Sequence, residues 1–207
     1  MTREIFKELF DKYKFTKVIH FAAESHVDNS ITGPGAFVQT NIVGTYNLLE
    51  SARSYWNDLD KNLKQDFRFL HISSDEVYGS LNSSDHPSNE KDPYKPNSPY
   101  SASKAASEIV ISSYRDAILR DQGVAVASAR AGNVIGGGDW AQDRLVPDIL
   151  IAFEKAEPAL IRFPNSTRPW QHVLEPLAGY LLLAEKLHRD GPVYANAWNF
   201  GPNDDDS

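Results

Sequence analysis

The sequence predicts an α/β fold built on a doubly wound parallel sheet. Short runs rich in apolar and β-branched residues, which suit buried strands, alternate along the chain with longer amphipathic runs that suit helices. This alternation is typical of parallel strands joined by crossover helices. Hydroxyl and acidic residues follow the apolar run 67–72 directly, and the carboxyl ends of strands are where open α/β sheets bind their ligands.

The first half of the chain supplies two helix-like and two strand-like segments. Residues 2–13 form an amphipathic run that predicts a helix, and residues 16–21 predict a strand. A second helix is predicted over residues 35–55, where apolar residues recur at helical spacing, and a second strand over residues 67–73. Residues 81–98 are rich in Ser, Asn, Asp and Pro, so they predict a surface loop.

The second half continues the same alternation. It predicts helices and strands in turn, at residues 100–121 (helix), 124–130 (strand), 144–155 (helix), 173–188 (helix) and 196–200 (strand). Residues 133–143 contain three consecutive glycines, and we expect them to form a mobile segment over a bound ligand.

Composition excludes several classes of function. A net charge of −7 argues against a nucleic-acid partner, because phosphate contacts need a basic surface. No apolar run approaches twenty residues, so no membrane partner is expected. The absence of cysteine excludes disulfides and thiol catalysis and fits a cytoplasmic location. The six histidines lack metal-ligand spacing, so no metal site is predicted.

Five residues form the most informative motif. Ser74, Asp75 and Glu76 follow the second predicted strand, and Tyr100 and Lys104 share one face of the third predicted helix. A nearby ammonium favours the phenolate, which makes a tyrosine a usable base near neutral pH. Two acids, a hydroxyl and a Tyr/Lys pair suit redox chemistry on an alcohol coupled to proton transfer at a neighbouring carbon.

Each part of this motif also has a purely structural interpretation. Paired acids such as Asp75 and Glu76 are often solvated loop charges, and a Tyr and a Lys four positions apart are common on exposed helices. Glycines 136–138 alone suit a flexible loop, because a phosphate nest needs a following helix N-terminus. The joint order of the motifs along the chain favours the functional interpretation.

Two sets of motifs resemble one group of enzymes. Residues 21–30 (FAAESHVDNS) and 40–45 (TNIVGT), with Ser-Asp-Glu at 74–76 and Tyr-x-x-x-Lys at 100–104, resemble dTDP-glucose 4,6-dehydratases. Residues 130–140 (RAGNVIGGGDW) and 168–176 (RPWQHVLEP) are similar to CDP-glucose 4,6-dehydratases. The chain thus resembles the nucleotide-sugar 4,6-dehydratases, within the extended short-chain dehydrogenases/reductases. CDP-glucose relatives usually carry Lys at the position of Glu76, so the nucleotide stays open between dTDP and CDP.

The resemblance implies a Rossmann-like sheet that is incomplete in this chain. Relatives open with a glycine-rich βαβ unit whose turn holds the cofactor pyrophosphate, and here no glycine precedes Gly33. We therefore expect an internal portion of a longer enzyme, truncated at both ends, whose 207 residues alone bind NAD weakly and do not turn over. Residues 1–130 then form the C-terminal portion of the NAD-binding domain. Residues 131–207 combine part of a small nucleotide-sugar-binding region with the last Rossmann elements.

The resemblance also implies a role for each motif residue. Tyr100 would take the proton of the sugar C4 hydroxyl while Ser74 bonds the same oxygen and Lys104 holds the nicotinamide ribose. Glu76 would remove the C5 proton, and Asp75 would protonate the departing C6 hydroxyl. The residues implied to line NAD are Phe21, Ala22, Ala23, Glu24, Ser25, Thr40, Tyr100, Lys104 and Val134. Those implied to contact dTDP- or CDP-glucose are Ser25, Ser74, Asn133, Arg144, Arg168 and Asn199.

Relatives pair through a four-helix bundle, which implies a homodimer formed by residues 35–55 and 100–121. Two alternatives remain open at this point. A sibling 4-epimerase is disfavoured because it needs no acidic pair after Ser74. A non-catalytic chain that keeps the fold or an oligomer interface is the other alternative, and NAD retention by the purified chain discriminates it from the dehydratase.

Overall fold

The computed structural model describes residues 2–81 and 86–202. Its main sheet has four strands in the order β1-β2-β3-β6, and all three pairings are parallel. The strands are β1 (Lys17–His20), β2 (Arg68–Ser74), β3 (Ala125–Ala131) and β6 (Ala197–Phe200). Each coincides within one or two residues with a strand predicted from the sequence, so the parallel α/β fold is confirmed.

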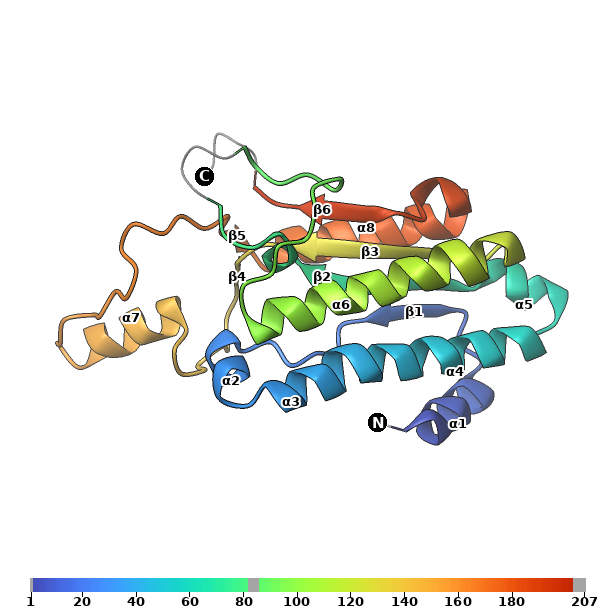
Figure 1. The fold of residues 1–207 in the computed structure, drawn as a ribbon, viewed down its shortest axis with the longest axis horizontal. Helices are drawn as coiled ribbons and strands as arrows, with labels where there is room; N and C mark the ends of the chain where they lie inside the picture. Colours follow the sequence, from blue (N-terminus) through green and yellow to red (C-terminus); the bar gives the residue numbers. More distant parts are fainter. Residues whose placement is uncertain (1, 82–85, 203–207) are drawn as a thin grey trace.

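Helices cover both faces of this sheet (Figure 1). On one face lie α1 (Arg3–Tyr13), α4 (Thr45–Asp58) and α6 (Pro99–Tyr114), whose apolar side chains form one core cluster with β2 and β3. On the opposite face, α8 (Leu174–Asp190) forms a second cluster with the same two strands. The sheet is therefore doubly wound, as the alternation of strands and helices predicts.

The two faces of β3 bury different kinds of side chain. Val126 points to α4 and α6, where it meets the aromatic rings of Phe67 and Phe69. The alternate residues of β3 are all alanines and face α8, which lets the helix approach the strand closely. Gly179 on α8 also lets this helix pack closely against the sheet, because a Cβ atom there would collide with the ring of Phe200 in β6.

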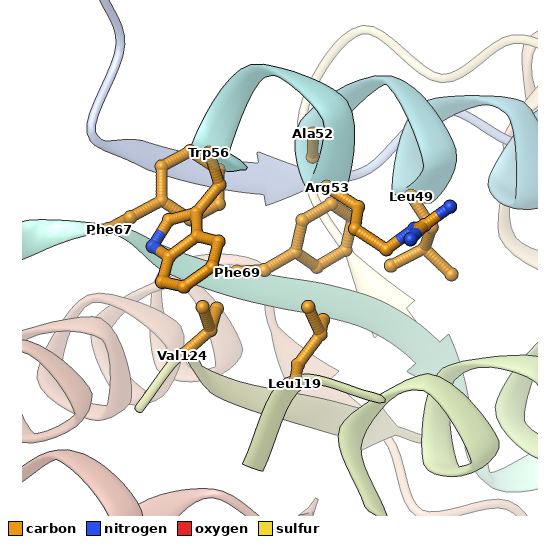
Figure 2. Close-up of a pocket in the computed structure, with 8 residues that line it drawn as sticks. All are labelled: Leu49, Ala52, Arg53, Trp56, Phe67, Phe69, Leu119 and Val124. Atoms are coloured by element: carbon orange, nitrogen blue, oxygen red, sulfur yellow. The ribbon is translucent and has the colours of Figure 1, made fainter. Parts of the chain in front are cut away.

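A small cavity remains inside the first core cluster. Figure 2 shows its lining, with Ala52 and Trp56 of α4 facing Phe69 of β2 and Val124 beside β3. The enclosed volume is about 10 Å³ and its walls are almost entirely apolar. A space of this size without polar partners holds neither a ligand nor an ordered water, so this cavity is a packing defect rather than a site.

Two predicted helices are interrupted by wider or tighter turns. The helix expected over 35–55 consists of α3 (Pro34–Phe37), the π-helix η1 (Val38–Gly44) and α4. The helix expected over 100–121 consists of α6, the π-helix η3 (Arg115–Leu119) and the 3-10 turn η4 (Arg120–Gln122). Such changes of pitch depend on tertiary contacts and leave no mark in hydrophobic periodicity.

Several short elements were not predicted from the sequence. They are α2 (Val27–Thr32), α5 (Lys61–Asp66), η2 (Asp75–Tyr78), η5 (Gly191–Tyr194) and the parallel pair β4 (Val134–Ile135) with β5 (Gln171–His172). The pair β4–β5 lies beyond the end of the main sheet, near α7 (Leu145–Glu154) (Figure 1). Part of the predicted loop 81–98 lies outside the described residues. Within the described residues no helix is long and apolar enough to span a bilayer.

Candidate active site

The carboxyl ends of β1, β2 and β3 lie at the same end of the sheet, because these strands are parallel and in register. This brings together residues 21–25 after β1, residues 75–76 after β2 and residues 133–134 after β3. The N-terminus of α6, which carries Tyr100, lies at this end too (Figure 1). The predicted motif residues are thus gathered at the place where open α/β sheets bind ligands.

The segment Ser74–Glu76, called the acidic segment below, is held in place by its first residue, Ser74. Ser74 ends β2 and acts as the N-cap of η2, where its Oγ accepts a hydrogen bond from the Glu76 backbone N–H at 3.2 Å. The same hydroxyl donates to Asp75 Oδ1 at 3.4 Å. Ser74 is buried, whereas Asp75 and Glu76 are half-buried. The strand end and the cap together present two carboxyl groups side by side.

Asp75 differs from an ordinary surface acid. Burial, together with the neighbouring charge of Glu76, raises its pKa from 3.8 to about 6, against the opposing effects of the Ser74 hydroxyl and the charge of Arg168. A Cβ atom on Gly132 would lie 2.9 Å from Asp75 Oδ2 and would also collide with Pro169. Asp75 is therefore packed against the segment after β3, and roughly a tenth of it stays protonated at pH 7, far more than of an ordinary surface aspartate. A carboxyl group in this state can donate a proton.

This raised pKa makes a prediction about stability. A carboxyl whose pKa is higher in the folded state contributes stability that is present below pH 3.8 and is lost as the pH rises through about 6. Asp75→Asn, which mimics the neutral carboxyl, should therefore raise the free energy of unfolding at pH 7.5 by about 3 kcal/mol. Urea unfolding between pH 4 and pH 7.5 measures this. The advantage should grow from pH 4 to pH 6 and then level off, and a gap that does not change with pH would contradict it.

Tyr100 occupies the first turn of α6. Ser98 caps this helix, in a reciprocal arrangement with Ser101, and Pro99 occupies its first position. Burial raises the pKa of Tyr100, the adjacent charges of Asp75 and Glu76 raise it further, and the Ser74 hydroxyl lowers it. The phenol thus lies within reach of the acidic segment.

The lysine of the motif does not act on Tyr100 as the sequence predicted. Lys104 is 4% exposed, and its Nζ donates to the Ile72 carbonyl at 2.7 Å. Burial lowers the pKa of Lys104 to about 8, against the opposing charge of Glu108. The expected lowering of the Tyr100 pKa is wrong for this structure, because desolvation of the phenol outweighs its favourable contacts.

The predicted cofactor-lining residues form a largely exposed rim. Phe21, Ala22, Glu24 and Ser25 are exposed, and Ala23 is half-buried in the same loop. Two others lie outside this loop: Thr40 is half-buried in η1, and Val134 is exposed in β4. The structure brings the loop 21–25 next to α6 through Asn41, which bonds the backbone of Glu24 and the side chain of Ser103.

The two predicted substrate-binding arginines lie near the motif. The charge of Arg144 lowers the pKa of Tyr100, and that of Arg168 lowers the pKa of Asp75, so both guanidinium groups lie near the acids and the phenol. Arg144 Nε is buried and has no hydrogen-bond partner among the described residues. Asn133, half-buried, follows Gly132 on the same side. A cationic pair with an unsatisfied N–H is suited to anionic oxygens.

Asn199 is placed differently from the other predicted residues. Its Oδ1 accepts a hydrogen bond from the Tyr78 hydroxyl at 2.9 Å, and its Nδ2 donates to the Ser88 carbonyl at 3.2 Å. Its amide is therefore engaged within the protein, and Asn199 is the least available of the predicted substrate contacts.

A buried charge pair lies behind the motif and contains Arg130, the charged residue of β3. Arg130 Nε donates to Glu108 Oε1 at 2.9 Å, and both side chains are 2% exposed. The guanidinium also donates to the hydroxyls of Tyr78 and Tyr94 and lies over both rings. The pair ties η2, which carries the acids, to α6. The only signal in the sequence was a charged residue in a strand otherwise free of charge.

Sequence reasoning also missed Tyr180. This residue of α8 is 5% exposed, and burial raises its pKa to about 12, with smaller contributions from the charges of Tyr100 and Asp75. Its ring packs edge-on against Phe21 and Phe200. It therefore forms the floor of the site from the opposite face of the sheet, a position that helical periodicity alone marks only as core.

Comparison with known proteins shows which sequences this chain is similar to. The family model described as GDP-mannose 4,6 dehydratase matches residues 2–198. The CDP-glucose 4,6-dehydratase of Salmonella typhimurium is 41% identical over 201 residues, covering 95% of this chain and 54% of that protein. The dTDP-glucose 4,6-dehydratase of Haemophilus influenzae is 43% identical over 183 residues, covering 87% and 53%.

A solved structure shows the same architecture. DesIV, a dTDP-glucose 4,6-dehydratase from Streptomyces venezuelae with NAD and TYD bound, matches with a TM-score of 0.75 at 30% identity. The match covers 96% of this chain and 55% of that one. The chain thus spans about half the length of the relatives it matches.

Proposed function

The chain belongs to the GDP-mannose 4,6 dehydratase family, and we propose that it carries the catalytic residues of an NAD-dependent nucleotide-sugar 4,6-dehydratase. The reaction converts a nucleoside-diphosphate glucose into its 4-keto-6-deoxy form, a step of deoxysugar biosynthesis. The observation that carries this proposal is the acidic pair beside Tyr100, in which Asp75 has a pKa of about 6. The substrate is dTDP- or CDP-glucose, and a cytoplasmic location stays a prediction.

The described residues fit the nicotinamide end of NAD. Lys104 uses one of its three N–H groups on the Ile72 carbonyl, and the exposed loop 21–25 lies beside its helix. The fit is confined to this end, because residues 1–32 contain no glycine from which a phosphate-binding turn could be built. When bound, NAD accepts a hydride from sugar C4 and returns it to C6.

The side chains of the site move the protons of this reaction. Tyr100, with Ser74 on the same oxygen, takes the proton of the C4 hydroxyl as the C4–H bond breaks. The resulting ketone acidifies the C5 proton, which Glu76 removes. Asp75 donates a proton to the C6 hydroxyl, which leaves as water. Glu76 then returns its proton to C5 as the hydride reduces C6, so the atoms and electrons balance.

The two carboxyl groups need opposite protonation states to do this. Burial and the charge of Glu76 keep Asp75 partly protonated near neutral pH, which supports its role as the acid. Arg144, Arg168 and Asn133 surround the same edge, and we assign them to the diphosphate and sugar. Asn199 stays a weaker proposal, because its amide is engaged by Tyr78 and Ser88.

The base assignment is tested in a protein where these 207 residues follow a glycine-rich cofactor-binding unit, called the extended protein below. Glu76→Gln should stop dehydration while oxidation at C4 continues, because it removes the proposed base for the C5 proton, and the proposed task of Asp75 is to protonate the C6 hydroxyl. The measurement is NADH absorbance that accumulates without 4-keto-6-deoxy product, together with loss of solvent-deuterium exchange at C5. Asp148→Asn, on α7, is the control. Turnover at the wild-type rate in Glu76→Gln would refute the assignment.

A 4-epimerase remains the second candidate and requires only Ser74, Tyr100 and Lys104. It leaves the acidic pair without a role, although Asp75 is buried at an energetic cost. Release of 4-keto-6-deoxy sugar by the extended protein supports the dehydratase, whereas release of a C4 epimer supports the epimerase. Failure to retain NAD in that protein supports a non-catalytic chain.

We further propose a homodimer formed by the helices at residues 35–55 and 100–121, assigned as a four-helix bundle. Ile109 on α6 and Val38 on η1 are 58% and 48% exposed on the face directed away from the sheet. Ile109→Arg should convert the dimer to a monomer, since a charge cannot be buried there without a partner. Leu182→Arg, a similarly exposed position on α8, is the control. Sedimentation velocity measures both, and a dimeric Ile109→Arg protein would contradict this interface.

A further inference from the structure

Pro169, which is half-buried, lies at the centre of a tight turn just before β5. The Trp170 N–H donates to the Arg168 carbonyl at 2.9 Å, and this bond closes a three-residue γ-turn around Pro169. The inverse γ-turn needs a φ of about −75° at its central residue, which is close to the value that a proline ring fixes. The turn therefore holds the ring of Pro169 in one orientation.

The strand β5 anchors this turn to the site. It pairs in parallel with β4, and the Gln171 N–H donates to the Asn133 carbonyl at 3.0 Å. The side-chain amide of Gln171 donates to the Phe200 carbonyl at 3.1 Å, which adds a bond to the main sheet. Pro169 is thereby placed against the segment that follows β3.

The ring of Pro169 and the carboxyl of Asp75 meet beside Gly132. A Cβ atom at Gly132 would collide with Pro169 Cγ, and it would lie 2.9 Å from Asp75 Oδ2 and 3.2 Å from the Pro169 carbonyl oxygen. These distances are shorter than van der Waals contact, so only a glycine fits between the ring and the carboxyl. Gly132 thus lets both groups close onto the same point.

The two oxygens of Asp75 have different surroundings. Oδ1 accepts a hydrogen bond from the Ser74 hydroxyl at 3.4 Å, whereas Oδ2 lies against Gly132, where the ring of Pro169 also packs. A proline ring has no N–H to donate, so it displaces water without stabilising a negative charge on the oxygen. A carboxyl in such surroundings favours its protonated form.

We propose that Pro169 and Gly132 are positioning residues that cover Asp75 Oδ2 against water and so let Asp75 keep the proton that it passes to the C6 hydroxyl. This inference rests on the proposed function. Both residues act through Asp75 and not on the sugar itself. The burial that raises the pKa of Asp75 to about 6 agrees with this cover.

Other ionisable groups face Asp75 and act on its protonation. They are Glu76 beside it, Tyr100 of α6, Tyr180 of α8 and Arg168 next to Pro169. Phenols are neutral and a guanidinium is charged between about pH 4 and pH 8, so only the second carboxyl, Glu76, can change its charge while Asp75 titrates. The titration is therefore also measured in the Glu76→Gln background.

Pro169→Ala is the decisive variant, because it removes the ring and leaves the backbone bonds around it in place. Carbon NMR of the Asp75 carboxyl, assigned with Asp75→Asn, follows the titration in the 207-residue chain. We expect the midpoint to fall by about one pH unit from the wild-type value, since water then reaches Oδ2. The fall should persist in the Glu76→Gln background.

Two further variants separate the cover from the turn. Pro169→Val keeps an apolar side chain of similar bulk that suits extended backbone, and it should titrate like wild type. Pro164→Ala removes an exposed proline five residues earlier and should also match wild type. A Pro169→Ala midpoint equal to that of wild type would overturn the cover, and so would a Pro169→Val midpoint that falls as far as that of Pro169→Ala.

Turnover of the extended protein gives a second readout. The acid must be protonated to act, so the rate of dehydration falls as the pH rises through the pKa of Asp75. Pro169→Ala should move this fall to lower pH and reduce dehydration at pH 7.5 by about tenfold. Oxidation at C4 should continue, so NADH accumulates. Loss of folded protein alone lowers both steps in proportion and leaves the pH profile unmoved.

The outcomes separate this inference from the proposed function. An active dehydratase whose Pro169→Ala variant keeps the wild-type pH profile overturns the cover alone. A wild-type extended protein that forms no 4-keto-6-deoxy sugar overturns the proposed function. The Asp75 titration of the 207-residue chain then still decides whether Pro169 covers its carboxyl.

Discussion

Tyr100→Phe in the extended protein should lower formation of the 4-keto-6-deoxy product by ~10²–10⁴-fold, the usual range for a general base. The substitution removes the phenolic oxygen that takes the proton of the C4 hydroxyl and leaves the ring in place. The Ser74 hydroxyl and the two acids remain at the end of β2, so the loss reports on the first oxidation step. Product formation is followed by absorbance of the 4-keto sugar in alkali.

Tyr114→Phe is the matched control, because it makes the same change on the same helix. Its hydroxyl donates a hydrogen bond to Glu50 Oε1 at 2.6 Å. Glu50 belongs to α4 and is far in sequence from the acidic segment at residues 74–76. We expect it to retain wild-type activity. Activity of Tyr100→Phe within a factor of about two of wild type would contradict general-base catalysis of that size.

The pH dependence of the oxidation step follows from the same residue. Burial raises the pKa of Tyr100 above its usual value of 10.0. The phenol is therefore mostly neutral at pH 7, and its ionised fraction continues to increase as the pH rises above neutral. The rate of C4 oxidation in wild type should therefore increase with pH over this range, and Tyr100→Phe should flatten the profile.

The second large effect concerns stability. Glu108→Gln should lower the free energy of unfolding by about 3–5 kcal/mol, because it leaves Arg130 as an uncompensated buried charge. Both side chains of this pair are 2% exposed, and Ser128 Oγ also donates to Glu108 Oε2 at 2.7 Å. Two tyrosine hydroxyls accept from Arg130 but carry no charge to replace the carboxylate.

Glu185→Gln is the control for this experiment. Glu185 pairs with Arg189 at 3.6 Å on α8, and the two side chains are 64% and 56% exposed. An exposed pair of this kind contributes about 0.3–0.5 kcal/mol. Urea unfolding of the 207-residue chain compares the two variants. A Glu108→Gln protein as stable as Glu185→Gln would show that Arg130 does not depend on its carboxylate.

The sequence by itself determined the order and type of the long elements and the end of the sheet at which chemistry is placed. The four main strands are apolar enough to be recognised locally, and Ser74, Asp75 and Glu76 follow one of them directly. Which positions of a helix or strand are buried depends on residues that are close in sequence, so hydrophobic periodicity and turn composition predict these elements. The division at residue 130 into two domains and the role of each site residue stay predictions.

Only the tertiary structure decided the electrostatics and the support of the site. Asn41 and Ser103 are 62 positions apart, and Tyr78 and Asn199 are 121 apart, so no local pattern marks these pairs. The raised pKa of Asp75 and the lowered pKa of Lys104 likewise depend on which parts of the chain bury these side chains. Hydrogen bonding and desolvation act between segments that meet only after folding, which is why the residue types were visible in the sequence and their protonation states and partners were not.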